Sequence, residues 1–173
     1  MRVPILERLK LGEVLVADGA TGTMLQAAGL PTGLPGEAWI LERPDQIAQL
    51  HAASLEAGSE LILTTTFGAT RSRLDAAGIA ASVHEINIAA AQIARAAAGD
   101  DRYVAGDIGP TGEMFPPIGK LSYERAAEMF AEQAKALAEG GVDAIFIETM
   151  TDLQEARAAV DGAIQACDIP VFC

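Results

Sequence analysis

The sequence predicts an α/β fold in which short buried parallel strands alternate with helices. Half of the 173 residues are hydrophobic but only 5% are aromatic, and alanine and glycine are abundant, which suits close packing of helices on a sheet. Short apolar runs recur along the chain, and the segments between them have the apolar spacing of amphipathic helices. Near-continuous apolar runs of this length are typical of strands that are buried on both faces.

Five apolar runs are the expected strands. In chain order they lie at residues 14–17, 61–63, 103–105, 144–147 and 169–172. Four helical patterns separate them. The first begins at Pro44, because proline suits the first helical position, and ends at Gly58. Ser82, Ser122 and Asp152 each precede a further pattern and supply the side-chain oxygen that caps a helix N-terminus.

No linker rich in proline, glycine or serine interrupts these units, so we expect one domain over residues 1–173. Right-handed crossovers between parallel strands leave two architectures, an open doubly wound sheet or part of a (β/α)₈ barrel. Periodicity alone does not choose between them.

The charge balance restricts the partners of the protein. Twenty-four acidic against twelve basic residues give a net charge of −12, which repels phosphate, so we expect neither nucleic acid nor an anionic membrane surface as a partner. No window approaches the roughly 18 uninterrupted apolar residues of a membrane span, and we expect a cytoplasmic protein. Cys167 and Cys173 are too few for a disulfide framework and are expected to be reduced thiols.

Polar residues follow the apolar runs at the points where the predicted strands end. They are Asp18-Gly19, residues 64–66, Asp107 and Glu148. Because the carboxyl ends of parallel strands face one mouth, these residues should lie close together. Each of them alone also fits a turn or a helix cap, but Asp18 and Glu148 together favour a site. Two carboxylates without basic residues nearby in the sequence attract an ammonium group or a metal ion.

Four stretches of the chain resemble, in order and spacing, the homocysteine-binding S-methyltransferase family, which includes the N-terminal module of cobalamin-dependent methionine synthase and betaine–homocysteine methyltransferase. They are VADGATGTMLQ, LILTTTFGATRSRL, AGDIGPTGE and EGGVDAIFIETMTDLQEA. The resemblance runs from residue 12 to residue 173 and implies a (β/α)₈ barrel, of which this chain would hold about strands 1–5. Family members bind homocysteine, coordinate its thiol to zinc, and transfer a methyl group to it from methylcobalamin, betaine or S-methylmethionine.

The resemblance also implies the residues that contact the substrate. Asp18 and Glu148 match the family acids that hold the amino group of homocysteine, in agreement with the electrostatic reasoning above. The segment 64–67 and the turn 107–111 match loops that line the same pocket. The substrate-binding residues implied in this way are Asp18, Gly19, Thr65, Thr66, Phe67, Asp107 and Glu148.

The zinc ligands of the family are three cysteines, one on a later strand and two in a GGCCG-type segment near the last strand. Neither Cys167 nor Cys173 matches one of them, so the resemblance implies no catalytic and no metal-binding residue in these 173 residues. We therefore expect a methyltransferase-type domain cut before its zinc site, with a non-catalytic amino-acid-binding or half-barrel interaction module as the alternative. Open edges on the first and fifth strands would favour a homo-oligomer, a complementary C-terminal half, or marginal stability.

Overall fold

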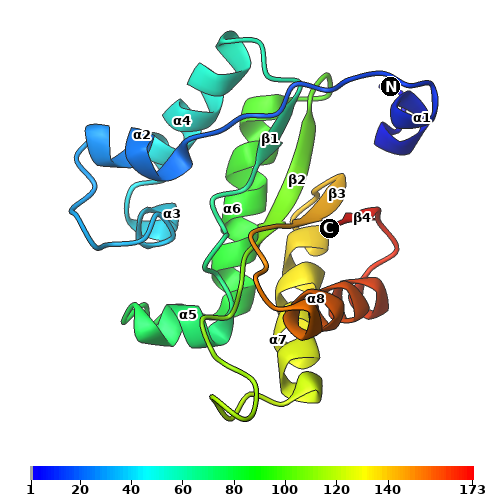
Figure 1. Cartoon of the computed structure of the whole chain (residues 1–173). Coiled ribbons are helices and arrows are strands. Elements are labelled where there is room, and N and C mark those ends of the chain that lie inside the picture. Colours follow the sequence, from blue (N-terminus) through cyan, green and yellow to red (C-terminus); the bar gives the residue numbers. More distant parts are fainter. Residues whose placement is uncertain (1) are drawn as a thin grey trace.

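A computed structural model describes residues 2–173, and a single parallel sheet forms its centre (Figure 1). The strands lie side by side in chain order, β1-β2-β3-β4, and every pairing is parallel. Their bounds are β1 Leu61–Leu63, β2 Tyr103–Ile108, β3 Ala144–Ile147 and β4 Val171–Phe172. The structure thus confirms that the last four of the five predicted segments are strands and that they pair in parallel in chain order.

The described residues form eight helices, and the four long ones are the predicted amphipathic segments. These are α4 (Pro44–Glu56), α6 (Val83–Ala98), α7 (Tyr123–Glu139) and α8 (Leu153–Ala166). Four short helices were not predicted: α1 (Ile5–Lys10), α2 (Thr21–Ala27), α3 (Ala38–Glu42) and α5 (Arg71–Ala76). Within residues 2–173, no helix is long and apolar enough to cross a membrane.

The predicted helix caps are confirmed. Side-chain oxygens of Ser82, Ser122 and Asp152 accept backbone N–H groups in the first turns of α6, α7 and α8, at N···O distances of 3.0, 3.2 and 2.7 Å. Each bond satisfies one of the N–H groups that the start of a helix leaves without a partner.

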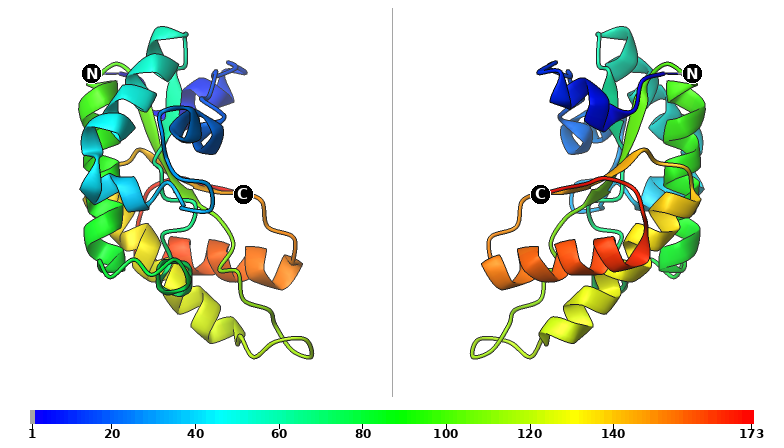
Figure 2. Two further views of the ribbon diagram at one scale, coloured as in Figure 1. Left: turned by 90° about the vertical axis from the view of Figure 1, so that its left-hand side faces the viewer. Right: turned by 90° about the vertical axis from the view of Figure 1, so that its right-hand side faces the viewer.

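The long helices cover one face of the sheet, and that face carries the main hydrophobic core (Figure 2). Ile62, Val104 and Ile145, from three adjacent strands, pack there with side chains of α6, α7 and α8. The opposite face has a smaller cluster around Leu61, which Ile5 of α1 joins. A doubly wound sheet would have helices on both faces. The one-sided covering therefore favours the barrel-type architecture over the doubly wound one.

Residues 14–17, which were predicted as the first strand, do not form a strand. Ala17 makes only an isolated parallel bridge to Leu61, and the side chains of Val14 and Val16 are 85% and 55% exposed. A segment with a partner on one side and little side-chain burial gains few ladder hydrogen bonds and little hydrophobic free energy. The segment nevertheless lies along the β1 edge, in the place expected for the first strand.

Two strand boundaries also differ from the prediction. β2 continues past Ala105 to Ile108, so Asp107 lies within the strand rather than after it. β4 begins at Val171 rather than Ile169. The preceding Pro170 has no N–H to donate to a ladder, although its carbonyl accepts the N–H of Ile145 at 2.8 Å.

Candidate functional site

A pocket of about 470 Å³ opens at the carboxyl ends of the strands, where ligands bind in parallel α/β folds. Its lining joins loops that are far apart in the sequence: Asp18, Gly19, Ala20, Thr21, Gly22, Pro35, Gly36, Glu37, Leu63, Thr65, Phe67, Asp107 and Glu148. Six of the seven predicted substrate-binding residues belong to this lining, and the exception is Thr66.

Asp18 is held at the mouth by the free edge of β1. The N–H of Leu63 donates to both carboxylate oxygens of Asp18, at 3.2 and 3.1 Å. The side chain of Asp18 thus takes the place of a backbone partner of β1, directly after the isolated bridge of Ala17. Burial raises the pKa of Asp18 to about 6, against the effect of the Leu63 hydrogen bond, and the charge of Glu148 adds to the rise.

Asp107 reaches the pocket from β2 and is 7% exposed. Its Oδ1 has no hydrogen-bond partner. Burial raises the pKa of Asp107 to about 8, and the negative charges of Glu148, Glu37 and Asp18 add to the rise. At neutral pH this carboxyl group is therefore mostly protonated.

Three polar side chains hold the ends of β1 and β2 together behind the pocket. The hydroxyl oxygens of Thr64 and Thr66 are 2.6 Å apart, and the Thr66 hydroxyl donates to the carbonyl of Asp107 at 2.7 Å. Gln133 of α7 donates to the carbonyl of Thr66 at 2.7 Å. Because Thr66 is fully buried in this network, it supports the pocket instead of lining it. Thr65 does line the pocket, and its buried hydroxyl oxygen has no partner.

Two residues with unusual backbone conformations lie beside the predicted acids. Ala20 has φ 43° and Thr149 has φ 61°, and left-handed conformations of non-glycine residues cost about 1–3 kcal/mol and cluster at functional sites. Thr149 directly follows Glu148, whose N–H donates to the carbonyl of Ile108 at 3.0 Å. This backbone path leaves the Glu148 side chain exposed at the rim of the pocket.

Glu37 is a pocket acid that the sequence analysis missed. It is 5% exposed, and its carboxylate accepts the N–H of Gly68. Burial raises the pKa of Glu37, and the Gly68 hydrogen bond and the charge of Arg73 oppose the rise. Glu37 follows no apolar strand run, so the search at strand ends could not find it. Its one sequence signal is that it is the only charged residue in the stretch 34–41.

Close contact between two loops shapes the wall formed by Phe67. A Cβ on Gly109 would lie 2.5 Å from the Phe67 ring, so any larger residue there would force the ring to shift, and the Gly109 N–H donates to the Phe67 carbonyl at 3.0 Å. Further along the same loop, the N–H and hydroxyl of Thr111 donate to the buried carboxylate of Glu155 in α8, at 2.9 and 2.6 Å. These bonds fix the turn 107–111 against the body of the protein.

Four carboxyl groups thus share one pocket, and its lining contains no lysine, arginine or histidine. Like charges in a partly buried site destabilise one another, and a bound cation relieves the repulsion. The volume lies within the roughly 300–1,000 Å³ of small-molecule sites. The geometry therefore fits a small molecule with an ammonium group.

Comparison with known families agrees with this chemistry. A family model described as homocysteine S-methyltransferase matches residues 15–173. The chain belongs to the homocysteine S-methyltransferase family. Curated members similar to it include methionine synthase of Mycobacterium leprae (strain TN), 37% identical over 176 residues, and methionine synthase of Mycobacterium tuberculosis (strain ATCC 25618 / H37Rv), 38% identical over 176 residues. Both alignments cover 92% of this chain but only 14% and 15% of those proteins, so the chain spans about one seventh of their length.

Solved structures with the same fold include the homocysteine methyltransferase MmuM from Escherichia coli. Its oxidized form matches with a TM-score of 0.80 at 22% identity, over 96% of this chain and 64% of that one. Its metallated form matches with a TM-score of 0.75 at 24% identity, over 93% and 62%. The match confirms the predicted barrel-type fold for the part of the barrel that this chain contains.

The cysteines of this homocysteine S-methyltransferase family member do not form a metal site with other described residues. Within residues 2–173, no group of three or more His, Cys, Asp or Glu is placed to hold a metal ion. Cys167 lies at the end of α8, its Sγ donates to the Ala163 carbonyl, and burial raises the pKa of its thiol, which opposes formation of a thiolate ligand. Cys173 is exposed after β4, and neither cysteine lines the pocket.

Proposed function

We propose that the chain is the homocysteine-binding part of an S-methyltransferase, which transfers a methyl group to the homocysteine thiol and yields methionine. The pocket at the strand ends carries the proposal, because its acids converge without a cation. Asp18 and Glu148 bind the ammonium group of the substrate. Gly19, Thr65 and Phe67 enclose the rest of the molecule.

Activation of the thiol is the step that residues 2–173 do not provide. Zinc lowers the pKa of a thiol and so creates the nucleophile at neutral pH, but the two cysteines here do not fit a zinc site. The role of these residues is therefore to bind and orient homocysteine. The proposal leaves the methyl donor open among methylcobalamin, betaine and S-methylmethionine.

Calorimetric titration of homocysteine into the full chain tests the binding step. We expect saturable binding of one molecule per chain. The matched control is 4-mercaptobutanoate, which has the thiol and the carboxylate of homocysteine but lacks the ammonium group. Because the acids of the pocket would have no cation to bind, we expect no measurable heat from it. Equal affinity for the two ligands would contradict the proposal.

The isolated chain is expected to hold no stoichiometric zinc and to lack methyl-transfer activity. Elemental analysis of the purified protein measures the first, and an assay for methionine formation the second. One tightly bound zinc per chain would contradict this expectation and would give Cys167 or Cys173 a role that their surroundings do not support.

A module that binds an amino acid without catalysis is the second candidate function. The observation that favours this module is a pocket whose described residues include no metal-binding cluster. Addition of a polypeptide that carries the remaining strands and the family cysteines distinguishes the two candidates. Methyl transfer restored by the mixture supports the enzyme, and homocysteine binding without any turnover supports the module.

We further propose that residues 1–173 form one domain that associates through the sheet edge formed by residues 14–17, either with a second copy or with a complementary C-terminal half. Val14 and Val16 lie exposed along this edge, and each large apolar side chain left in water forfeits about 1.5–3 kcal/mol. Light scattering at micromolar concentration should show dimers or larger species, or a marginally stable chain. A monodisperse monomer that melts cooperatively at high temperature would contradict this proposal.

We place the protein in the cytoplasm, with a small amino acid rather than nucleic acid or a membrane as its partner. Both cysteines are free, which is the usual state in a reducing compartment. The net charge of −12 disfavours binding to phosphate backbones and to anionic lipids.

A further inference from the structure

A zwitterionic amino acid brings a carboxylate as well as an ammonium group into the pocket. The pocket already holds four carboxyl groups, and no cationic side chain lines it. A further ionised carboxylate would be repelled by the others. The carboxylate of the substrate therefore needs neutral hydrogen-bond donors, and the unpartnered hydroxyl of Thr65 supplies only one.

The surroundings of Asp107 suit it to be that donor. It lines the pocket and is 7% exposed, and its Oδ1 is buried without a hydrogen-bond partner. Its backbone is held on both sides, since its N–H donates to the Thr64 hydroxyl at 2.9 Å and its carbonyl accepts the Thr66 hydroxyl at 2.7 Å. The fixed backbone thus holds a carboxyl group with an unsatisfied polar atom at the wall of the pocket, where a ligand can reach the group.

Two neighbouring acids, unlike Asp107, accept a backbone N–H at their carboxylate oxygens. Asp18 accepts the N–H of Leu63, and Glu37 accepts the N–H of Gly68. A hydrogen bond donated to a carboxylate stabilises its ionised form. Oδ1 of Asp107 receives no such bond, so Asp107 is the acid on which a proton is best retained.

We propose that Asp107 enters the complex as the neutral acid and donates its O–H to the substrate carboxylate, while Asp18 and Glu148 bind the ammonium group. The inference rests on the proposed function, because it assigns a role within the same pocket. The ammonium group of the zwitterion then contacts negatively charged carboxylates, and its carboxylate contacts a neutral hydrogen-bond donor.

The charged groups around Asp107 favour this protonation state. Those that face it from the neighbouring elements are Asp18 beside β1, Glu37 at the start of α3 with Arg73 close to it, and Glu148 after β3. Together with burial they raise the pKa of Asp107 to about 8. The affinity for homocysteine should therefore fall about tenfold per pH unit above pH 8, as the donor is lost.

Calorimetric titration of the full chain between pH 6.5 and 9 tests the inference with two probes. The first is homocysteine, and the second is 3-aminopropane-1-thiol, which is homocysteine without its carboxylate. We expect the fall above pH 8 for homocysteine only. Asp107→Asn keeps a donor of the same shape, so it should bind homocysteine within about threefold of the wild-type affinity at pH 7 and lose the fall. Asp107→Ala should weaken homocysteine binding about tenfold to a hundredfold and leave the aminothiol unaffected.

Two outcomes of these titrations would contradict the inference. Homocysteine affinity that rises as the pH passes 8, or loss of binding at pH 7 in a folded Asp107→Asn protein, would mean that Asp107 binds as a carboxylate, and would overturn the inference but not the proposed function. No binding of either probe by the wild type at any pH would overturn both. Thermal unfolding shows whether each variant is folded, and if the asparagine variant is not, the wild-type profiles of the two probes decide.

Discussion

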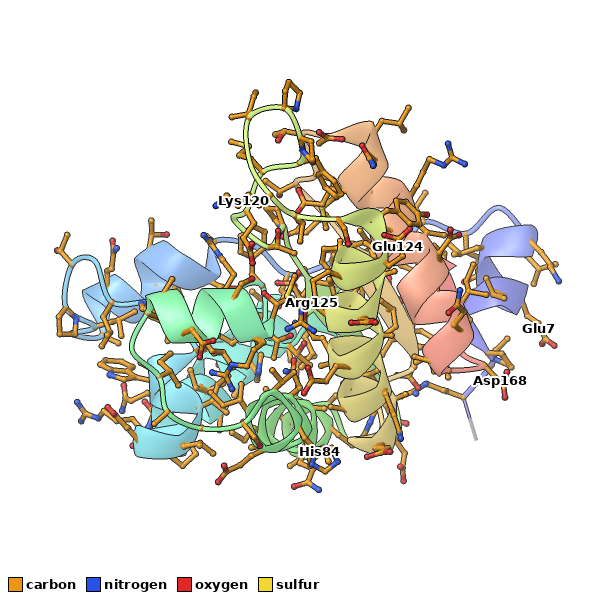
Figure 3. The ribbon with its side chains drawn as sticks, turned by 90° about the horizontal axis from the view of Figure 1, so that it is seen from below. Glu7, His84, Lys120, Glu124, Arg125 and Asp168 are labelled. Atoms are coloured by element: carbon orange, nitrogen blue, oxygen red, sulfur yellow. The ribbon has the colours of Figure 1, made fainter. Side chains whose placement is uncertain are left out.

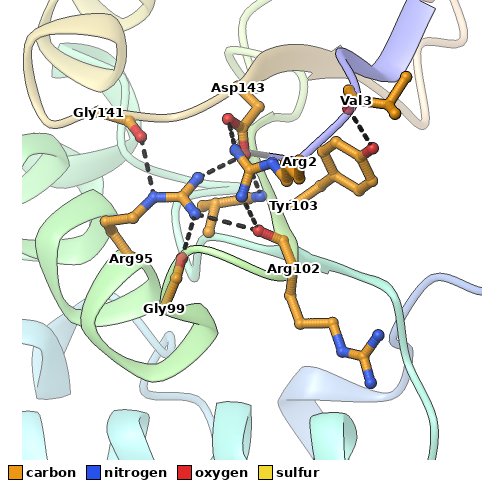
Figure 4. A network of polar contacts seen from close by, with 9 residues as sticks. Arg2, Val3, Arg95, Gly99, Arg102, Tyr103, Gly141 and Asp143 are labelled. Atoms are coloured by element: carbon orange, nitrogen blue, oxygen red, sulfur yellow. Dashed lines mark hydrogen bonds and ion pairs between the residues drawn. The ribbon is translucent and has the colours of Figure 1, made fainter. Parts of the chain in front are cut away.

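Carboxyl groups lie at both ends of the sheet, but they are paired with cations only at the amino end. At the amino end, Asp143 is ion-paired with both Arg2 and Arg95, and it also accepts the N–H of Val104 at 2.8 Å (Figure 4). The Tyr103 hydroxyl of the same network donates to a backbone carbonyl of the N-terminal segment. At the carboxyl end, the pocket acids have no cation in the lining.

The difference separates stabilising polar groups from groups available to a ligand. A carboxylate with two guanidinium partners is neutralised and its removal leaves two half-buried cations unpaired, so it holds the N-terminal segment on the sheet. At the carboxyl end, neighbouring negative charges add to the raised pKa of Asp18 and Asp107, and a bound cation relieves the repulsion. The amino end therefore contributes to stability, and the carboxyl end keeps groups that the proposed ligand would pair.

Removal of Asp143 should produce the largest effect. Asp143→Ala leaves two half-buried guanidinium groups and the Val104 N–H without their acceptor, and we expect a loss of about 3–4 kcal/mol in the free energy of unfolding. Denaturant titration measures it. The matched control is Asp168→Ala, an exposed acid after α8 near the edge of the molecule in Figure 3, which should change stability by less than about 0.5 kcal/mol. Equal losses in the two variants would remove the contrast between paired and unpaired acids.

The pH dependence of stability should reveal the unpaired carboxyl end. The folded state binds the proton of Asp107 more tightly than the unfolded chain, because burial raises its pKa from 3.8 to about 8. The resulting stability is fully present below about pH 4 and is lost as the pH rises to 8. The free energy of unfolding of the wild type, relative to Asp107→Asn, should thus fall by roughly 2–4 kcal/mol from pH 5 to pH 8. A flat difference across this range would contradict the assigned burial of Asp107.

The smallest expected effect comes from Glu148→Gln, and it should separate binding from stability. We expect about tenfold weaker homocysteine binding, with an unchanged or slightly higher free energy of unfolding, because the change removes a charge that raises the pKa of Asp18 and Asp107. Calorimetric titration and denaturant unfolding measure the two quantities. Glu7→Gln, an exposed position on α1 also seen in Figure 3, should alter neither. Unchanged affinity in Glu148→Gln would count against its role in ammonium binding.

Local patterns in the sequence predicted most of the elements. Apolar runs at residues 61–63 and 144–147 match β1 and β3, and proline at the start of α4 and the capping residue Ser82 mark helix starts that the structure confirms. These signals depend on backbone geometry and on neighbours a few residues away, so they can be read without knowledge of the fold. The same signals failed at residues 14–17, because strand formation there depends on a second neighbouring strand.

The sequence by itself placed Asp18, Asp107 and Glu148 at or just after the ends of apolar runs, and the geometry of parallel strands predicted that they meet at one mouth, as the pocket lining confirms. Only the tertiary structure decided that Glu37 joins them and that Thr66 turns into a supporting network. It also decided that Oδ1 of Asp107 is buried without a partner. The physical reason is that burial and hydrogen-bond partnership depend on contacts between residues far apart in the chain. Glu37 and Gly68 are 31 positions apart, and Thr66 and Asp107 are 41 apart. Short-range periodicity carries no information about such contacts.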